Sequence, residues 1–185
     1  MSGNHLRPAI FLDRDGVIIE NKPDYVRQWA DVAFLPGALE ALARLAATDY
    51  LVVIATNQAV VGRGLASLAE AQDTNERVIA EIRRAGGRVD GAYLCPHHPD
   101  ENCRCRKPRP GMLLDAADEL GLDLAASVMI GDAVSDVQAA LAAGVRPVLV
   151  ETGHGREQIE VLGSELRSKV RVFPDLAAAI AALAP

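Results

Sequence analysis

The sequence predicts a doubly wound α/β fold, in which helices cover both faces of a parallel sheet. Short apolar runs alternate from end to end with longer segments whose apolar residues recur every three or four positions. This alternation is typical of strand–helix–strand units. With 185 residues, half of them apolar, the chain is long enough for one core and too short for two. We therefore expect a single domain over residues 1–185.

The expected elements follow from these two periodicities. The apolar runs predict strands at residues 9–12, 51–55, 92–94, 128–130, 145–150 and 170–173. The helical spacing predicts helices at residues 37–47, 68–84, 111–120, 134–143 and 175–183. Glycines follow three of these helices, at Gly86-Gly87, Gly121 and Gly144, where a left-handed C-terminal cap favours glycine.

The overall composition limits the classes of partner. A net charge of −6 and a sequence pI near 5.2 argue against a nucleic-acid-binding surface, because phosphate backbones are held by clustered Lys and Arg. The longest apolar stretches, residues 50–62 and 176–185, are shorter than the roughly 18 to 20 residues that span a bilayer. Residues 1–8 carry no signal-peptide hydrophobic region. We therefore expect a cytoplasmic protein that binds neither nucleic acid nor membrane.

The first expected strand ends in two carboxylates, Asp13 and Asp15, two residues apart. Ligands of open parallel sheets bind beyond the carboxyl ends of the strands, so both acids should face the active-site crevice. A loop cap is the simpler alternative. A calcium loop is another, but residues 17–19 are apolar where further acids are needed. Because paired carboxylates cluster at functional sites, catalysis is the favoured interpretation.

Two further strand ends carry polar side chains. Thr56, Asn57 and Gln58 follow the second strand, where hydroxyl, amide and backbone N–H groups can hold a phosphate, although Thr and Asn also often cap helices. Asp132 follows the fourth strand, and Asp136 lies four residues further on. With Asp13 they would form a hard-oxygen magnesium site. The alternative for this pair is an N-cap and a first-turn acid. Capping would then have to occur independently at three strand ends.

One loop, residues 95–110, fits neither periodicity; we call it the cysteine-rich loop. It holds four prolines, all three cysteines and two adjacent histidines. Cys95, Cys103 and Cys105 with one histidine make four ligands suited to tetrahedral zinc, which leaves no open position and is therefore structural. Free surface cysteines are the alternative. Spacing alone does not decide between His97 and His98.

Arg106 and Lys107 directly follow the last cysteine. A lysine directed at the carboxylates would neutralise the charge of a transferring phosphoryl group. An Arg-Lys pair is, by itself, more often simply solvated. Here whatever clamps the cysteine-rich loop would also position this pair.

Together these residues resemble the haloacid dehalogenase superfamily of phosphohydrolases. The resemblance covers about residues 9–153 and rests on FLDRDG, TNQ, CPHHP, CRCRKPRPGML and GDxxxD in the family's order. It implies an α/β fold and a magnesium-dependent phosphatase. Asp13 would be the nucleophile that forms an aspartyl-phosphate, and Asp15 the general acid and base. Thr56 and Lys107 would hold the phosphoryl oxygens.

The resemblance also implies ligands and substrate contacts. Mg²⁺ would be bound by Asp13, the Asp15 carbonyl and Asp132, with Asp136 in support. Zn²⁺ would be bound by Cys95, His97, Cys103 and Cys105, which favours His97 over His98. The substrate-contacting positions would be Asn57, Gln58, Arg106 and, in a loop whose length differs by one from the family's, Asn21, Asp24 and Tyr25. We call this loop, residues 21–25, the flap.

Three positions depart from the family pattern: Val17 stands where Thr is frequent, Ala59-Val60 replaces Ser-Gly, and Ala133 replaces a frequent Lys. These departures leave the nucleophile and metal ligands unchanged but can remove phosphate or sugar contacts. The expected elements already fill the intervals 13–56 and 56–107, so no cap domain fits. Small phosphorylated metabolites, such as a sugar bisphosphate, are the expected substrates of a monomeric enzyme.

Two other classes of protein remain open. A phospho-accepting signalling module would store the phosphoryl group, but an acid/base at Asp15 would speed its loss. A zinc-ribbon interaction protein is disfavoured by the complete set of acids and the acidic balance. Turnover of a generic phosphate ester with Mg²⁺ would distinguish an enzyme from both.

Overall fold

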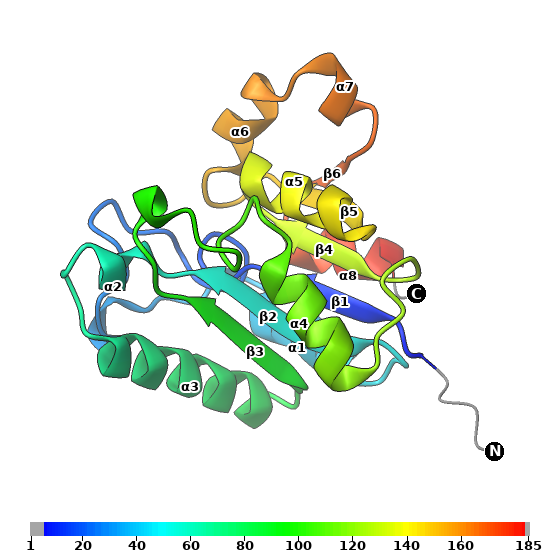
Figure 1. Ribbon diagram of the computed structural model, residues 1–185. Helices are drawn as coiled ribbons and strands as arrows, with labels where there is room; N and C mark the ends of the chain where they lie inside the picture. Colours follow the sequence, from blue (N-terminus) through cyan, green and yellow to red (C-terminus); the bar gives the residue numbers. More distant parts are fainter. Residues whose placement is uncertain (1–5, 184–185) are drawn as a thin grey trace.

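A computed structural model describes residues 6–183, and its strands form one parallel sheet. The strands are β1 (Ala9–Leu12), β2 (Leu51–Asn57), β3 (Gly91–Cys95), β4 (Val128–Gly131), β5 (Arg146–Val150) and β6 (Arg171–Phe173). Their order is β3-β2-β1-β4-β5-β6, so the first strand lies in the middle of the sheet and later strands are added on both sides of it (Figure 1). The predicted fold class is confirmed.

Helices lie on both faces of this sheet. The α-helices are α1 (Ala38–Leu45), α2 (Ala59–Gly62), α3 (Leu68–Arg84), α4 (Gly111–Leu120), α5 (Val134–Ala143), α6 (Gly155–Val161), α7 (Ser164–Arg167) and α8 (Leu176–Leu183). Two short 3-10 helices, η1 (Trp29–Asp31) and η2 (Pro99–Glu101), complete the set. Contacts place α1 against α3 and α8, and α4 against α5.

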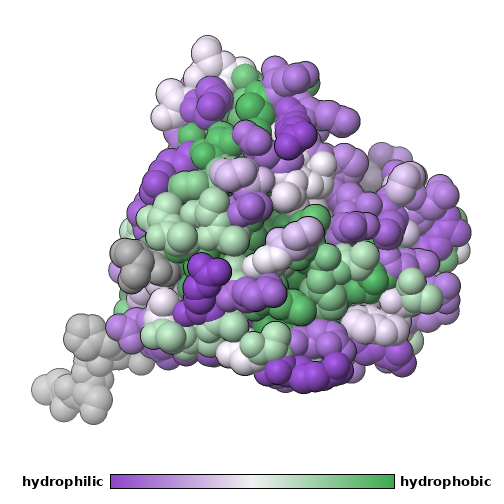
Figure 2. All heavy atoms as spheres, turned by 180° about the vertical axis from the view of Figure 1, so that it is seen from behind, coloured by the Kyte–Doolittle hydropathy of each residue, from purple (hydrophilic) through white to green (hydrophobic). Residues whose placement is uncertain are grey.

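Alternate residues of β1 supply two separate cores. Ile10 and Leu12 pack in a cluster with residues of α1, α3 and α8, whereas Phe11 packs with residues of α4 and α5. Side chains of a strand alternate between faces, so an unbroken apolar strand serves both helical layers. Figure 2, seen from the side of α1 and α8, shows apolar side chains gathered across the middle of that face with hydrophilic ones around them.

Three expected helices, α3, α4 and α5, have the predicted bounds. Ser67 is the N-cap of helix α3. Its hydroxyl accepts from the Glu70 backbone N–H, while the Glu70 carboxylate accepts from the Ser67 N–H, which makes a capping box. Gly121 and Gly144 end α4 and α5 with φ of +64° and +75°, as predicted for left-handed caps.

The shortest helices, α2, α6 and α7, were not predicted from the sequence. α2 and α7 have four residues each, which is too few to show a helical period. α6 has seven residues, of which only Gly155 is buried, so it has no apolar stripe to detect. Figure 1 shows α6 and α7 projecting beyond the sheet next to α5. The expected helix at 37–47 is shorter, beginning after Gly37 and ending at Leu45.

Among residues 6–183 no cap domain interrupts the fold, because residues 13–56 hold the flap, η1 and α1, and residues 56–107 hold α2, α3, β3 and η2. No helix in this part of the chain has the length and apolar character needed to cross a membrane. The expectation about a signal peptide concerns mainly residues 1–5, which lie outside the described residues.

Candidate active site and metal centres

Three neighbouring strand ends bring the predicted polar residues together. β1 lies between β2 and β4, with Leu12 paired to Ile54 on one side and to Ile130 on the other. Asp13 therefore emerges between the ends of β2 and β4, which carry Thr56 and Asp132. This edge of an open parallel sheet is where ligands bind.

Lys107 enters this group of acids from the cysteine-rich loop and is almost fully buried. Its ammonium nitrogen lies 3.1 Å from Asp13 Oδ1 and 2.6 Å from Asp136 Oδ1, and it donates to the Ala55 carbonyl at 2.7 Å. Asn57 braces its backbone, because the Asn57 amide accepts from the Lys107 N–H and donates to the Lys107 carbonyl, each at 3.1 Å. The oxygen and the NH₂ group of the Asn57 side chain thus both help to position Lys107 in this structure.

Asp13, Asp132 and Asp136 each offer a carboxylate oxygen, and these oxygens lie within 4.8 Å of one another. Burial raises the pKa of Asp13 to about 8; Lys107 opposes this shift, and Asp136 adds to it. Burial, with Asp136, also raises the pKa of Asp132 to about 6. One ammonium therefore faces more negative charge than it neutralises. Clustered carboxylate oxygens with an excess of negative charge fit Mg²⁺.

The raised pKa of Asp13 predicts that magnesium binding tightens as pH rises. Below its pKa of about 8, Asp13 holds a proton that the cation must displace. Between about pH 6 and pH 8 the affinity should therefore rise, by up to about tenfold per pH unit. The metal-free fold should lose stability over the same range, because the folded chain holds this proton more tightly than the unfolded chain does.

Isothermal titration calorimetry with MgCl₂ in buffers of different ionisation enthalpy measures both the affinity and the protons released. Close to one proton should be released per ion at pH 7. Magnesium affinity that stays constant from pH 6 to pH 8 would contradict the shifted pKa.

Asp15 lies apart from the three carboxylates that face one another. Its carboxylate accepts from Nε and an NH₂ group of Arg14, at 3.0 and 3.2 Å, and from Gln58 Nε2 at 2.8 Å. Gln58 Nε2 also donates to Thr56 Oγ1 at 2.9 Å. The side-chain N–H groups of Gln58 therefore hold both Asp15 and Thr56 in place. The Asp15 side chain is thus fixed by Arg14 and Gln58 outside the group of three facing carboxylates.

Asp136 also caps a helix. Its Oδ2 accepts from the Ala133 N–H at 3.1 Å, at the start of α5, while its Oδ1 faces Lys107. A Cβ on Gly131 would lie 2.2 Å from Asp136, so only glycine leaves room for this arrangement. Asp136 therefore acts as a helix cap through one carboxylate oxygen and faces the site through the other, so the two interpretations do not exclude each other.

The cysteine-rich loop brings four candidate zinc ligands together. Cys105 Sγ lies 3.2 Å from Cys95 Sγ and from His97 Nδ1, and 3.5 Å from Cys103 Sγ. Cys95 Sγ lies 3.5 Å from His97 Nδ1 and from Cys103 Sγ. Zinc–sulfur bonds of about 2.3 Å give tetrahedral edges of about 3.8 Å, so the cluster is close to the size that zinc requires.

The neighbouring histidine has a different role. His98 Nδ1 accepts from the Asp100 N–H at 3.3 Å and caps η2, outside the sulfur cluster. Its backbone also packs against α2, because a Cβ on Gly62 would lie 2.1 Å from the His98 nitrogen. The structure thus separates two histidines that the spacing alone left equivalent.

The catalytic pocket has a volume of about 340 Å³ and two neighbours. Its lining includes Asp13, Asp15, Asn21, Lys22, Tyr25, Asn57, Gln58, Asp132, Ser135 and His154. A hollow of about 380 Å³ adjoins it through Asn57 and Ser135 and contains Arg106, one of whose guanidinium nitrogens is buried without a partner. A larger hollow of about 760 Å³ adjoins it through Lys22, Pro23 and Tyr25.

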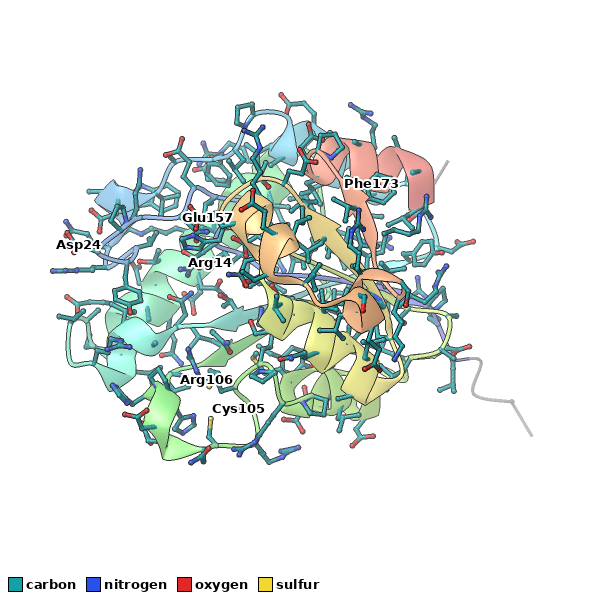
Figure 3. The ribbon with its side chains drawn as sticks, turned by 90° about the horizontal axis from the view of Figure 1, so that it is seen from above. Arg14, Asp24, Cys105, Arg106, Glu157 and Phe173 are labelled. Atoms are coloured by element: carbon teal, nitrogen blue, oxygen red, sulfur yellow. The ribbon has the colours of Figure 1, made fainter. Side chains whose placement is uncertain are left out.

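Asp24, which the resemblance implies as a substrate contact, does not line the catalytic pocket itself. It lines only the larger hollow, and Figure 3 shows it at the outer edge of the flap, away from Arg14. The reason is a turn in which the Tyr25 N–H donates to the Lys22 carbonyl and Tyr25 has a φ of +65°. This turn carries Tyr25 back to the pocket and leaves Asp24 exposed on the outside.

Four polar residues of the site were given no role from the sequence: Arg14, Lys22, Ser135 and His154. Arg14 lies within the FLDRDG motif, where a buried arginine between two acids signals an ion pair. Lys22 lies inside the predicted flap. Ser135 lies in the predicted helix 134–143 and His154 follows the predicted strand 145–150, but neither residue belongs to a motif that signals a site.

Comparisons with known proteins agree with this geometry. A model of the HAD-hydrolase-like family matches residues 104–179. The D-glycero-β-D-manno-heptose-1,7-bisphosphate 7-phosphatase of Bordetella bronchiseptica is 43% identical over 91% of this chain and 93% of its own. The protein of the same name from Pseudomonas aeruginosa is 39% identical, over 96% of this chain and 98% of its own.

The crystal structure of D,D-heptose 1,7-bisphosphate phosphatase from B. bronchiseptica, complexed with magnesium and phosphate, superposes with a TM-score of 0.90. The two chains are 41% identical in this alignment, which covers 95% of this chain and 97% of that one. The resemblance inferred from the motifs is thereby confirmed. The chain belongs to the haloacid dehalogenase-like hydrolases and, within them, to the family of the D-glycero-β-D-manno-heptose-1,7-bisphosphate 7-phosphatases.

Proposed function

We propose that the protein is a magnesium-dependent phosphatase that removes the 7-phosphate of D-glycero-D-manno-heptose 1,7-bisphosphate through an aspartyl-phosphate. The observation that carries the reaction type is Asp13, which lines the catalytic pocket, is paired with Lys107 and lies beside two further buried carboxylates. The names of the similar proteins support this substrate. The reaction would then belong to the biosynthesis of nucleotide-activated heptose.

In the first step an Asp13 carboxylate oxygen attacks phosphorus, and the bond from phosphorus to the sugar oxygen breaks. Asp15 donates a proton to the leaving alkoxide. Lys107 and Thr56 hold the phosphoryl oxygens. Asp13, Asp132 and the Asp15 carbonyl, with Asp136 beside them, would hold Mg²⁺, which supplies positive charge at the phosphoryl group.

In the second step Asp15, now a carboxylate, accepts a proton from water. The water oxygen bonds to phosphorus, the bond from phosphorus to Asp13 breaks, and phosphate leaves with the Asp13 carboxylate regenerated. Arg14 and Gln58 keep the Asp15 carboxylate in place, and the 3.5 Å separation from Thr56 Oγ1 puts it beside a phosphate-binding group. An Asp15 that assists both steps favours hydrolysis over storage of the phosphoryl group.

Structural zinc bound by Cys95, His97, Cys103 and Cys105 would serve this chemistry by fixing a loop. Lys107 lies two residues beyond the last ligand, and its backbone is held from the other side by Asn57. Arg109 further stabilises the loop, because its guanidinium donates a hydrogen bond to the Cys103 carbonyl at 3.0 Å. The loop therefore delivers Lys107 to the acids from a fixed direction.

Arg106 is the group that would recognise the far end of the substrate. It lines the hollow that adjoins the catalytic pocket, with a buried guanidinium nitrogen that has no partner there. A guanidinium fork suits a second phosphate or sugar hydroxyls. Histidinol phosphate would instead bring an amine and an imidazole, which this cation does not favour.

We expect kcat/KM for the heptose bisphosphate to exceed that for histidinol phosphate by at least about tenfold, or about 1.4 kcal/mol. Arg106→Ala should reduce this ratio more than it slows hydrolysis of a small generic ester. Arg104→Ala is the matched control, since Arg104 pairs with Asp115 outside this hollow. Phosphate release with each substrate measures the ratio. A wild-type preference for histidinol phosphate would refute the heptose assignment and leave the phosphatase chemistry standing.

A further inference from the structure

The flap is joined to the carboxylate cluster by one hydrogen bond. Asn21 Nδ2 donates to Asp132 Oδ2 at 2.7 Å, across 111 positions of sequence. Asp132 is almost fully buried, and Asn21 is half-buried at the wall of the catalytic pocket. A short bond to a buried carboxylate is of the stronger, charge-assisted kind.

The surroundings of Asp132 Oδ2 are unusually tight. The backbone N–H of His154 donates to the same oxygen at 2.8 Å. Gly16 and Gly153 close the remaining sides: a Cβ on either would lie 2.1 or 2.2 Å from Asp132 Oδ2 and within 2.8 Å of Asn21 Nδ2. Both glycines have positive φ, +84° and +59°. Two donors and two glycines therefore hold Oδ2, and Oδ1 is the oxygen left for a cation.

We propose that Asn21 is a positioning residue that fixes Asp132 in its metal-ligating orientation and thereby couples the flap to Mg²⁺ binding. The inference rests on the proposed function, in which Asp132 is a magnesium ligand. Partners that orient a metal ligand commonly change metal affinity by about 10- to 100-fold when removed. The next flap residues, Lys22, Pro23 and Tyr25, line the catalytic pocket, so the same bond sets where they stand.

Coupling between two sites is reciprocal. If an ordered flap strengthens magnesium binding, magnesium must stabilise the ordered flap by the same factor. A residue that merely filled space would give no such link. The two effects can be measured separately and without substrate.

The test compares the wild-type protein, with its zinc, against Asn21→Ala and Asn21→Leu. Leu keeps the approximate volume and lacks the N–H donor, so it separates packing from hydrogen bonding. Titration with MgCl₂ alone should show affinity about 10- to 100-fold weaker in both variants.

Hydrogen–deuterium exchange gives the second readout. Mg²⁺ should slow amide exchange in residues 20–26 of the wild type and have little effect on that segment in either variant. Gln28→Ala, an exposed change just beyond the flap, should keep wild-type magnesium affinity and protection.

Magnesium affinity within about twofold of wild type in both Asn21 variants would overturn the coupling. Mg²⁺ that slowed exchange in the flap equally in the wild type and in both variants would also overturn it. Recovery of affinity by Leu but not by Ala would also overturn it, since packing alone would then suffice. A wild-type protein that binds no Mg²⁺ and releases no phosphate would refute the proposed function itself. A wild-type enzyme that does both, beside unaffected Asn21 variants, would refute this inference alone.

Discussion

Asp13→Asn should lower turnover by at least about 10⁴-fold while the fold stays intact. The amide has nearly the same shape as the carboxyl group but cannot form the acyl-phosphate. Because burial raises the pKa of Asp13 to about 8, this side chain is already mostly neutral at pH 7, so the metal-free variant should unfold no earlier than wild type. Phosphate release and thermal unfolding followed by circular dichroism measure the two effects.

Asp118→Asn provides the matched control, because Asp118 is exposed on α4 and lines none of the three hollows described above. It should retain wild-type turnover. Activity of the Asp13 variant within about tenfold of wild type would remove Asp13 from the nucleophilic role. Simple loss of folding, seen in the circular dichroism spectrum, would be recognised by comparison with this control.

His97→Ala and His98→Ala should have opposite outcomes although the residues are adjacent. His97 Nδ1 lies 3.2 Å from Cys105 Sγ, whereas His98 caps η2 through Asp100. Loss of His97 should therefore remove stoichiometric zinc and loosen the loop that carries Lys107, with a large fall in both melting temperature and kcat. His98→Ala should keep one zinc per chain and lose only a cap, worth about 1 kcal/mol.

Elemental analysis of protein purified without chelator, combined with thermal unfolding, distinguishes the pair. Zinc should survive mild chelation that removes magnesium, because thiolate ligands bind it far more tightly. Phosphatase activity lost with magnesium should return when the ion is added back. Wild-type protein with no stoichiometric zinc, or a His97 variant that retains it, would contradict the assignment.

The strand-end residues were predictable from local patterns. An apolar strand leading directly into Asp13, and another leading into Asp132, place acids at one edge of a parallel sheet whatever the details of the helices. The pairing of β1 with both β2 and β4 then makes their convergence a matter of topology. Cys95, Cys103 and Cys105 were predictable for a different reason, since the ligands lie within one short loop.

Contacts between distant or irregular segments were not predictable in this way. Asn21 reaches Asp132 only because Gly16 and Gly153 leave room, and no sequence period records that approach. Asp24 faces outward because one flap residue, Tyr25, has a positive φ. A substrate-contact pattern transferred position by position cannot foresee a turn of this kind.

The roles of Gln58 and Asn57 could not be predicted from residue type either. Both match substrate-contacting positions, yet their amides hold Asp15 and Lys107 in the structure. Polar side chains beside a phosphate site can act on the substrate or on its binding groups. Only the hydrogen-bond geometry distinguishes these roles, because the residue types required are the same.

The most direct measurement is the mass of the peptide that contains Asp13, taken during turnover. Asp15→Asn should slow the enzyme by about 10² to 10⁴ without inactivating it. An aryl phosphate has a good leaving group and needs no proton from Asp15, so the first step should proceed while hydrolysis of the intermediate is slow. Acid quenching of this variant should trap one added HPO₃ on Asp13. Continued phosphate release with no adduct, or with the adduct on another residue, would contradict the aspartyl-phosphate mechanism.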